Sequence, residues 1–79
     1  MIFEGHDYAI DRVKSVNLEK FITACQDGSV YLWSTKRKKP MHKFLKAHDG
    51  WIGGLGVIPQ SNYFATGAID KKVKIWKIG

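Results

Sequence analysis

Four residue types that can form hydrogen bonds with one another occur twice in the sequence, in the same order. In both sets the aspartate lies six residues before the tryptophan and four residues after the threonine. The two sets are His6, Thr23, Asp27 and Trp33, and His48, Thr66, Asp70 and Trp76. An aspartate, a histidine and a hydroxyl could activate a nucleophile, as in a catalytic triad. Such a triad needs a hydroxyl that a substrate can reach, whereas two copies that each end at a tryptophan suit repeated structural work better.

Metal and phosphate binding are further possibilities for these residue types. His6, Asp7, His48 and Asp49 all carry side chains that can bind a metal ion. The segment Gly53-Gly54-Leu55-Gly56 is rich in glycine, but its spacing is not that of a phosphate-binding loop. No closely paired carboxylates stand out elsewhere. The sequence therefore predicts no catalytic residues, no metal, no cofactor and no enzyme activity.

The two sets lie within an internal repeat. When the sequence is shifted by 43 residues, five of the thirteen positions from Phe21 to Trp33 are identical to those from Phe64 to Trp76, where chance would give roughly one. His6 matches His48 at a shift of 42, so one loop differs in length by one residue. A period of this size indicates a fold that is assembled from similar units.

The elements that must position the repeated residues are short strands. Residues 21–25 and 30–33 predict a hairpin, because Asp27-Gly28 tolerates the positive φ of a tight turn. A second hairpin is predicted from residues 63–67 and 73–76, around a turn at 70–72. Further strands are predicted at residues 13–18, 41–46 and 51–58, with turns at 18–20 and 59–62. No segment has a sustained apolar period of 3.6 residues, so no helix is expected.

This combination of period and residues resembles the WD40 repeat family over nearly the whole chain. Repeats of 40–45 residues that begin near a histidine and end at a tryptophan are typical of that family. The resemblance implies an all-β fold with antiparallel four-stranded blades of a β-propeller, of which about two are present. Ser34 and Lys77 replace the aspartate of the Trp-Asp pair, and Ala47 replaces the glycine before His48. These positions vary widely in the family.

The resemblance also implies that each set is a buried structural tetrad. A tryptophan N–H can only donate, whereas a threonine hydroxyl can accept from it and donate to one histidine nitrogen. The other histidine nitrogen then donates to the aspartate. Each bond contributes on the order of 1 kcal/mol, and an unpaired buried partner costs roughly 1–3 kcal/mol. A structural role for both histidines argues against the metal site.

Residues 1–46 would form the first repeat and a first blade complete with its outer strand. Residues 47–79 would form the second repeat, which supplies three strands of the next blade. Two blades cannot close a ring, and repeat units bury their apolar faces against neighbours. The expected partners therefore include the remaining blades of a longer parent chain or further copies of this one.

Composition points to an intracellular protein. The 79 residues are 44% hydrophobic and 13% aromatic, which is above the range of disordered chains. Cys25 is the only cysteine, so an internal disulfide is excluded and a reducing compartment is favoured. Met1-Ile2-Phe3 is followed at once by Glu4, so we expect no signal peptide. No apolar run is long enough to cross a membrane, and no membrane partner is expected.

The net charge of +6 is concentrated in one segment. Six basic residues lie within eleven positions that contain no acidic residue: Lys36, Arg37, Lys38, Lys39, Lys43 and Lys46. The other seven basic residues are balanced by seven acidic ones. Lys36, Arg37, Lys38 and Lys39 form a candidate loop for RNA phosphates or for nuclear import. Alternatively, they form a solvated loop that protects a sheet edge from aggregation.

A second candidate surface lies at the starts of the blades. Trp51 follows Asp49-Gly50 at a blade start, where family members often recognise partners, and Tyr8 holds a comparable place in the first repeat. Lys71 and Lys72 lie in a turn that should open on the same face. The alternative for Trp51 is packing against the adjacent blade.

A narrower resemblance suggests a function. The segments that carry it are 27–33, Lys38-Lys39-Pro40, Lys46-Ala47-His48, Trp51-Ile52 and Ala65-Thr66-Gly67. They look like late blades of WD40 proteins of the U3 small nucleolar ribonucleoprotein. That resemblance implies a scaffold that binds other proteins and small nucleolar RNA in the nucleolus, and acts in pre-rRNA processing and ribosome biogenesis. The alternative is a protein–protein adaptor in chromatin, trafficking or ubiquitin transfer with no RNA role.

Overall fold

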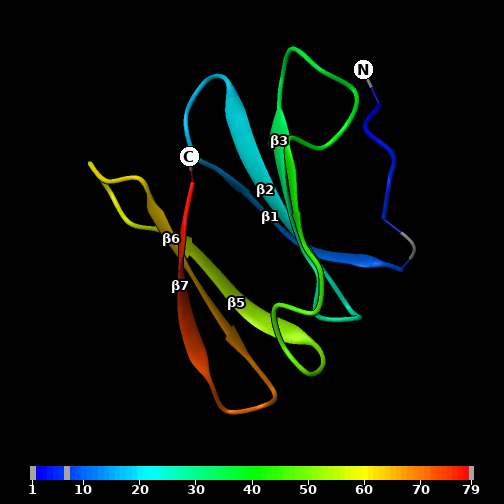
Figure 1. Cartoon of the computed structure of the whole chain (residues 1–79), viewed down its shortest axis with the longest axis vertical. Coiled ribbons are helices and arrows are strands. Elements are labelled where there is room, and N and C mark those ends of the chain that lie inside the picture. The colour runs from blue at the N-terminus through cyan, green and yellow to red at the C-terminus, as the bar shows by residue number, and fades with distance from the viewer. Residues whose placement is uncertain (1, 7, 79) are drawn as a thin grey trace.

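The computed structural model describes residues 2–6 and 8–78, and it contains two antiparallel sheets (Figure 1). The first sheet has the order β1-β2-β3-β4, and the second has the order β5-β6-β7. The strands are β1 (Ile10–Ser15), β2 (Lys20–Cys25), β3 (Val30–Ser34), β4 (His42–Phe44), β5 (Ile52–Val57), β6 (Tyr63–Ala68) and β7 (Val73–Lys77). The described residues contain no helix and therefore no helix that could cross a membrane. The predicted all-β class is confirmed.

The two predicted hairpins are present in matching register. Phe21 pairs with Trp33 between β2 and β3, and Phe64 pairs with Trp76 between β6 and β7. In both turns an aspartate side chain accepts a hydrogen bond from the backbone N–H two residues later. Ser29 N donates to Asp27, and Lys72 N donates to Asp70. This local hydrogen bond is the reason that aspartate favours turns.

The first strand lies earlier in the sequence than predicted. It spans Ile10–Ser15, whereas the expectation was residues 13–18. The Asn17 side chain accepts hydrogen bonds from the backbone of Glu19 (2.8 Å) and Lys20 (3.0 Å), and Val16 N donates to Lys20 O (2.9 Å). This tight turn ends the strand at Ser15. The predicted fourth strand is likewise shorter, because only His42–Phe44 pairs with β3.

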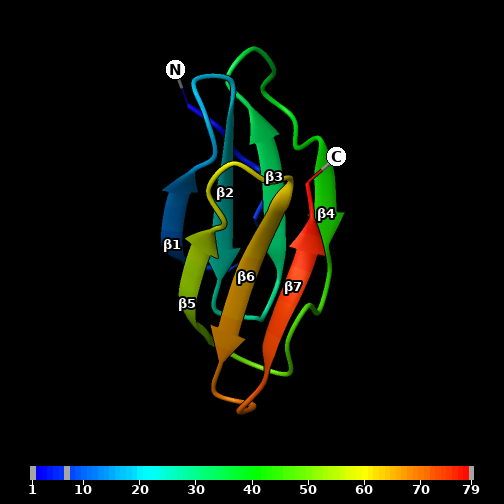
Figure 2. The same ribbon diagram turned by 90° about the vertical axis from the view of Figure 1, so that its left-hand side faces the viewer.

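The hydrophobic core lies between the two sheets, which pack face to face (Figure 2). The first sheet contributes mainly one face of β2 and β3, including Ile22, Ala24, Val30 and Leu32. The second sheet contributes residues that include Ile52, Leu55 and Phe64. Because side chains alternate between the faces of a strand, Trp33 and Thr23 lie on the other face of the first sheet.

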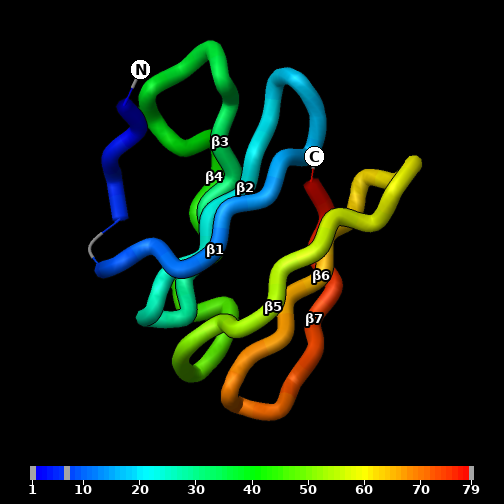
Figure 3. Tube along the Cα trace, turned by 180° about the vertical axis from the view of Figure 1, so that it is seen from behind, coloured from blue at the N-terminus to red at the C-terminus, as the bar shows by residue number. Residues whose placement is uncertain are grey.

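The inner strands of the two sheets, β1 and β5, run beside each other (Figure 3). Arg12 Nε donates to the carbonyl of Gly53 (3.3 Å), and the Trp51 indole N–H donates to the Asp11 carboxylate. These contacts join residues about 40 positions apart and fix one blade against the other.

The loops gather at two opposite ends of the sheets. One end, here called the Trp51 end, holds residues 8–9, 26–29, 45–51 and 69–72. Backbone bonds connect these loops: Gln26 N donates to Ala9 O, His48 N to Gly28 O, and Ile69 N to Trp51 O. The opposite end, here called the basic end, holds residues 16–19, 35–41 and 58–62. Antiparallel pairing places these loops together (Figure 1).

Candidate functional site

The second set of repeated residues forms a continuous chain of hydrogen bonds. Trp76 Nε1 donates to Thr66 Oγ1 (2.9 Å), and Thr66 Oγ1 lies 2.6 Å from His48 Nε2. His48 Nδ1 lies 3.0 Å from Asp70 Oδ2. Since the indole can only donate, Thr66 Oγ1 accepts from it and can direct its own proton to Nε2, in which case Nδ1 donates to Asp70. His48 and Thr66 are buried, so this chain satisfies polar groups that water cannot reach.

The Asp70 carboxylate ends this chain and is stabilised in its charged form. Burial by itself would raise its pKa, but hydrogen bonds from His48 and from the backbones of Lys72 and Asp49 outweigh that effect. The pKa of Asp70 is therefore lowered from its ordinary value. The carboxylate connects the blade-start segment at His48 to the turn between β6 and β7.

The first set shows the same geometry for three of its members. Trp33 Nε1 donates to Thr23 Oγ1 (2.8 Å), which lies 2.5 Å from His6 Nε2. The His6 ring stacks on Tyr31 with a centroid separation of 3.8 Å, and the Tyr31 hydroxyl donates to the carbonyl of Gly5 (3.2 Å). These contacts hold the N-terminal segment against the face of the first sheet.

Asp27, the fourth member of the first set, accepts a hydrogen bond from Cys25, a side chain that was not predicted to belong to the set. The Cys25 thiol donates to Asp27 Oδ1 (2.5 Å), and the backbone N–H of Ser29 donates to the same oxygen (3.0 Å). Burial opposes charge at Asp27, but these bonds and the nearby His6 together lower its pKa. Burial and the bond to Asp27 raise the pKa of Cys25, so the thiol is held in its unreactive protonated form.

The geometry of the two threonines does not suit a nucleophile. Both hydroxyls are buried, and each already accepts from a tryptophan and lies against a histidine. Within residues 2–6 and 8–78, no group of three histidine, cysteine or acidic side chains gathers in a way that could hold a metal ion. Asp7, one member of the metal set considered above, lies outside the described residues.

The candidate partner residues lie in loops at the Trp51 end. Tyr8 is 61% exposed and Trp51 is 45% exposed, and Lys71 and Lys72 are exposed in the neighbouring turn. The Trp51 side chain contacts the neighbouring blade and is also partly exposed. Its N–H bridges to Asp11 in the first sheet, while nearly half of its surface remains open to solvent.

The basic loop lies at the opposite end of the sheets. Residues 36–39 are all exposed, in the connection between β3 and β4. Lys36 contacts Glu19 at 3.2 Å, but both side chains are more than half exposed, so this ion pair is worth little. The structure therefore separates the two candidate surfaces and does not combine them into one site.

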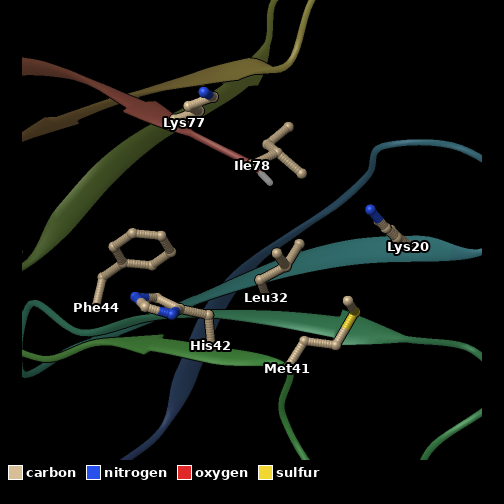
Figure 4. A pocket seen from close by; sticks show the side chains of 7 residues that line it. All are labelled: Lys20, Leu32, Met41, His42, Phe44, Lys77 and Ile78. Carbon is tan, nitrogen blue, oxygen red and sulfur yellow. The ribbon is translucent and has the colours of Figure 1, made fainter.

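A pocket at the basic end was not anticipated from the sequence. It has a volume of about 270 Å³ and lies between the end of β7 and strands β2, β3 and β4 of the first sheet (Figure 4). Its lining combines Lys20, Met41 and His42 with Lys77 and Ile78. The two groups are more than thirty positions apart in the sequence, so no local motif connects them.

Sheets of this kind, with a tryptophan–threonine–histidine chain in each and a core between them, define adjacent blades of a β-propeller. The family model "WD domain, G-beta repeat" matches residues 1–34 and 38–77. The chain therefore belongs to the WD40 repeat family.

Named relatives extend this assignment. U3 small nucleolar RNA-interacting protein 2 of Mus musculus is 27% identical over 100% of this chain and 19% of its own length. Ribosomal RNA-processing protein 9 of Saccharomyces cerevisiae is 29% identical over 89% of this chain and 18% of its own. The target of rapamycin complex subunit LST8-1 of Arabidopsis thaliana is 38% identical over 72% of this chain and 21% of its own. The chain thus spans about a fifth of the length of these relatives.

A solved structure agrees with these matches. "Structure of U3-55K" superimposes with a TM-score of 0.91 at 27% identity, and the match covers 100% of this chain and 27% of that one. The predicted WD40 family and the narrower similarity to U3 WD40 proteins are both confirmed as similarities.

Proposed function

We propose that this chain forms two blades of a WD40 scaffold that assembles into a small nucleolar ribonucleoprotein and acts in pre-rRNA processing. Two relatives support the proposal, since their names refer to U3 small nucleolar RNA and to ribosomal RNA processing. The observation that carries it is the similarity to the U3 protein along the whole chain. WD40 propellers typically act as scaffolds without enzymatic activity, and a nucleolar location would follow from this role.

Residues 1–46 and 47–79 would be the two repeat units of this scaffold. The hydrogen-bonded sets would fasten each unit, because each joins a blade-start histidine to the second and third strands of its sheet. The remaining blades would come from a longer parent chain or from further copies.

The basic loop would contact RNA. Four adjacent cationic side chains, Lys36 to Lys39, are exposed on one loop and can lie along a phosphate backbone. Because phosphate contacts release counterions, the loop would supply affinity and orientation more than sequence specificity.

The test is recovery of the full-length protein from cells, followed by sequencing of the bound RNA. The variant changes Lys36, Arg37, Lys38 and Lys39 to alanine. The matched control changes four lysines outside both candidate surfaces and the pocket, at positions 14, 43, 46 and 74. The proposal expects enrichment of U3 small nucleolar RNA with the native protein and the control, and its loss with the loop variant that still reaches the nucleolus. Absence of any enriched RNA would contradict it.

A protein–protein adaptor is a second candidate, favoured by the exposed aromatic rings at the Trp51 end. Tyrosine and tryptophan are enriched among residues that dominate binding at interfaces. Alanine at Tyr8, Trp51, Lys71 and Lys72 would then release protein partners, while the loop variant would retain them. Unchanged partner recovery in the first variant would rule this candidate out.

A further inference from the structure

We propose that the pocket at the basic end binds an acidic peptide segment of a partner protein through one large apolar side chain. The proposal does not depend on an RNA role, because the pocket and the basic loop are made of different residues. Both blades build the pocket: β2, β3 and β4 form one wall, and the end of β7 forms the other (Figure 4).

The pocket has an apolar floor. Leu32, Ile78, Phe44 and Met41 line it, and the first two are almost fully buried. Backbone bonds hold this floor in place, since Met41 N donates to Leu32 O and Ile78 N donates to Asn62 O, each at 2.7 Å. A volume of about 270 Å³ is just below the roughly 300–1,000 Å³ of small-molecule sites, so it suits one or two side chains.

The rim of the pocket is cationic. Lys20 lies on the first sheet and Lys77 on the second, and the His42 imidazole adds a further polar group. None of the described lining residues is acidic. The basic loop, residues 36–39, emerges from the same end and extends the positive field. An apolar floor within a cationic rim is complementary to an apolar side chain flanked by aspartate or glutamate.

The floor favours a peptide over a nucleic acid. A nucleobase binds best on an open aromatic face. The Phe44 ring is already packed against His42 (4.4 Å), Trp76 (5.2 Å) and Phe64 (5.5 Å) between centroids. The other floor residues, Leu32, Met41 and Ile78, have no flat ring to stack on a base. Their side chains pack well against leucine or phenylalanine.

The experiment measures fluorescence polarisation of a labelled peptide made of aspartate and glutamate with one central phenylalanine, bound to the full-length protein. The pocket variant Lys20→Glu/Lys77→Glu should weaken binding at least about tenfold, because it reverses the charge of the rim. The matched control, Lys14→Glu/Lys46→Glu, carries the same change in charge at exposed positions outside the pocket and should stay within about twofold of the native protein.

Two further arms test the apolar anchor. Met41→Gln keeps the length of a half-exposed side chain and should weaken peptide binding, as should replacement of the central phenylalanine by alanine. Circular dichroism and thermal unfolding verify that each variant is folded. Equal binding by the pocket and control variants, or by the peptide without phenylalanine, would overturn the proposal. The proposal would also be overturned if the native protein did not bind the peptide but did bind a uridine-rich oligoribonucleotide, and if the pocket variant lost that RNA binding.

Discussion

Each threonine of the two sets makes two hydrogen bonds that no apolar side chain could replace. Thr66 Oγ1 accepts from Trp76 and contacts His48, and Thr23 does the same for Trp33 and His6. Within each hydrogen-bonded set, the threonine hydroxyl is the group that can both accept and donate through a single atom. Its removal leaves an indole N–H and an imidazole nitrogen without their partner, and in each set one of these two groups is buried.

Thr66→Val should therefore destabilise the protein although it preserves the shape of the side chain. We expect a loss of about 2–3 kcal/mol, because the buried His48 nitrogen and the partly buried Trp76 N–H become unsatisfied. Urea unfolding monitored by tryptophan fluorescence measures the change. Thr35→Val is the matched control, since Thr35 is exposed and its hydroxyl makes one long hydrogen bond, to Leu18 O at 3.3 Å. Similar losses in the two variants would show that the buried bonds contribute little.

Asp70 should make stability depend on pH in the acid range. Its pKa in the folded protein lies below the ordinary value of 3.8. A lowered pKa means that the carboxylate stabilises the fold above pH 3.8, and that this contribution is lost as the pH falls through the lowered pKa. The free energy of unfolding should therefore decrease on acidification below pH 3.8. Asp70→Asn should flatten that decrease in a series of unfolding curves, and an unchanged slope would contradict the assignment.

At the scale of elements, the two equivalent hairpin turns differ in how they meet their surroundings. Gly28 has a φ of +89°, and the aligned position in the second blade is Lys71 with a φ of +66°. Only the first turn lies against the other blade, where Gly28 O accepts from His48 N (3.2 Å). A side chain is therefore tolerated at Lys71 in the second turn, but not at Gly28 in the first turn.

Gly28→Ala should consequently destabilise the protein by at least about 1–3 kcal/mol, from left-handed strain and a steric clash. A Cβ at this position would lie 2.1 Å from the carbonyl oxygen of His48. Gly53→Ala is the control, because a Cβ there would meet nothing within 4 Å. Thermal unfolding should show a lower midpoint for the first variant and no loss for the second. The reverse order would refute this account of the turn.

At the scale of the whole molecule, the fold separates the basic loop from the exposed rings of Trp51 and Tyr8. Antiparallel strands carry the basic loop to one end of the sheets and the segments that hold the exposed Tyr8 and Trp51 to the other. The blade core lies between these ends, so a ligand at one end leaves the other open. A scaffold that joins two different partners needs this kind of separation.

The salt dependence of RNA binding should distinguish the two ends. If the loop at residues 36–39 contacts phosphates of single-stranded RNA, alanine at all four positions should make the slope of log affinity against log salt shallower by roughly 3. Alanine at Tyr8 and Trp51 should leave the slope unchanged. Titrations of the U3 RNA at several salt concentrations measure both. Equal slopes for the native protein and the loop variant would place the RNA contact elsewhere.

The sequence by itself determined the elements and the repeated sets, because their signals are local and occur twice. Alternating apolar residues, Asp-Gly in a turn and a tryptophan at a fixed distance from an aspartate can be recognised within thirteen residues. The concentration of charge at Lys36 to Lys39 is equally local. Both limits of β1 escaped prediction, because its end depends on the turn formed by the Asn17 side chain and its start depends on pairing with β2.

Only the tertiary structure decided which residues from different repeats meet. The bond from Trp51 to Asp11, the contact of Gly28 with His48 and the pocket between Met41 and Ile78 all join segments far apart in the sequence. Hydrophobic patterning specifies which face of each sheet is buried, but it does not specify the angle and offset at which two sheets pack. These contacts depend on that packing, because side chains from separate sheets touch only after the core between them has formed.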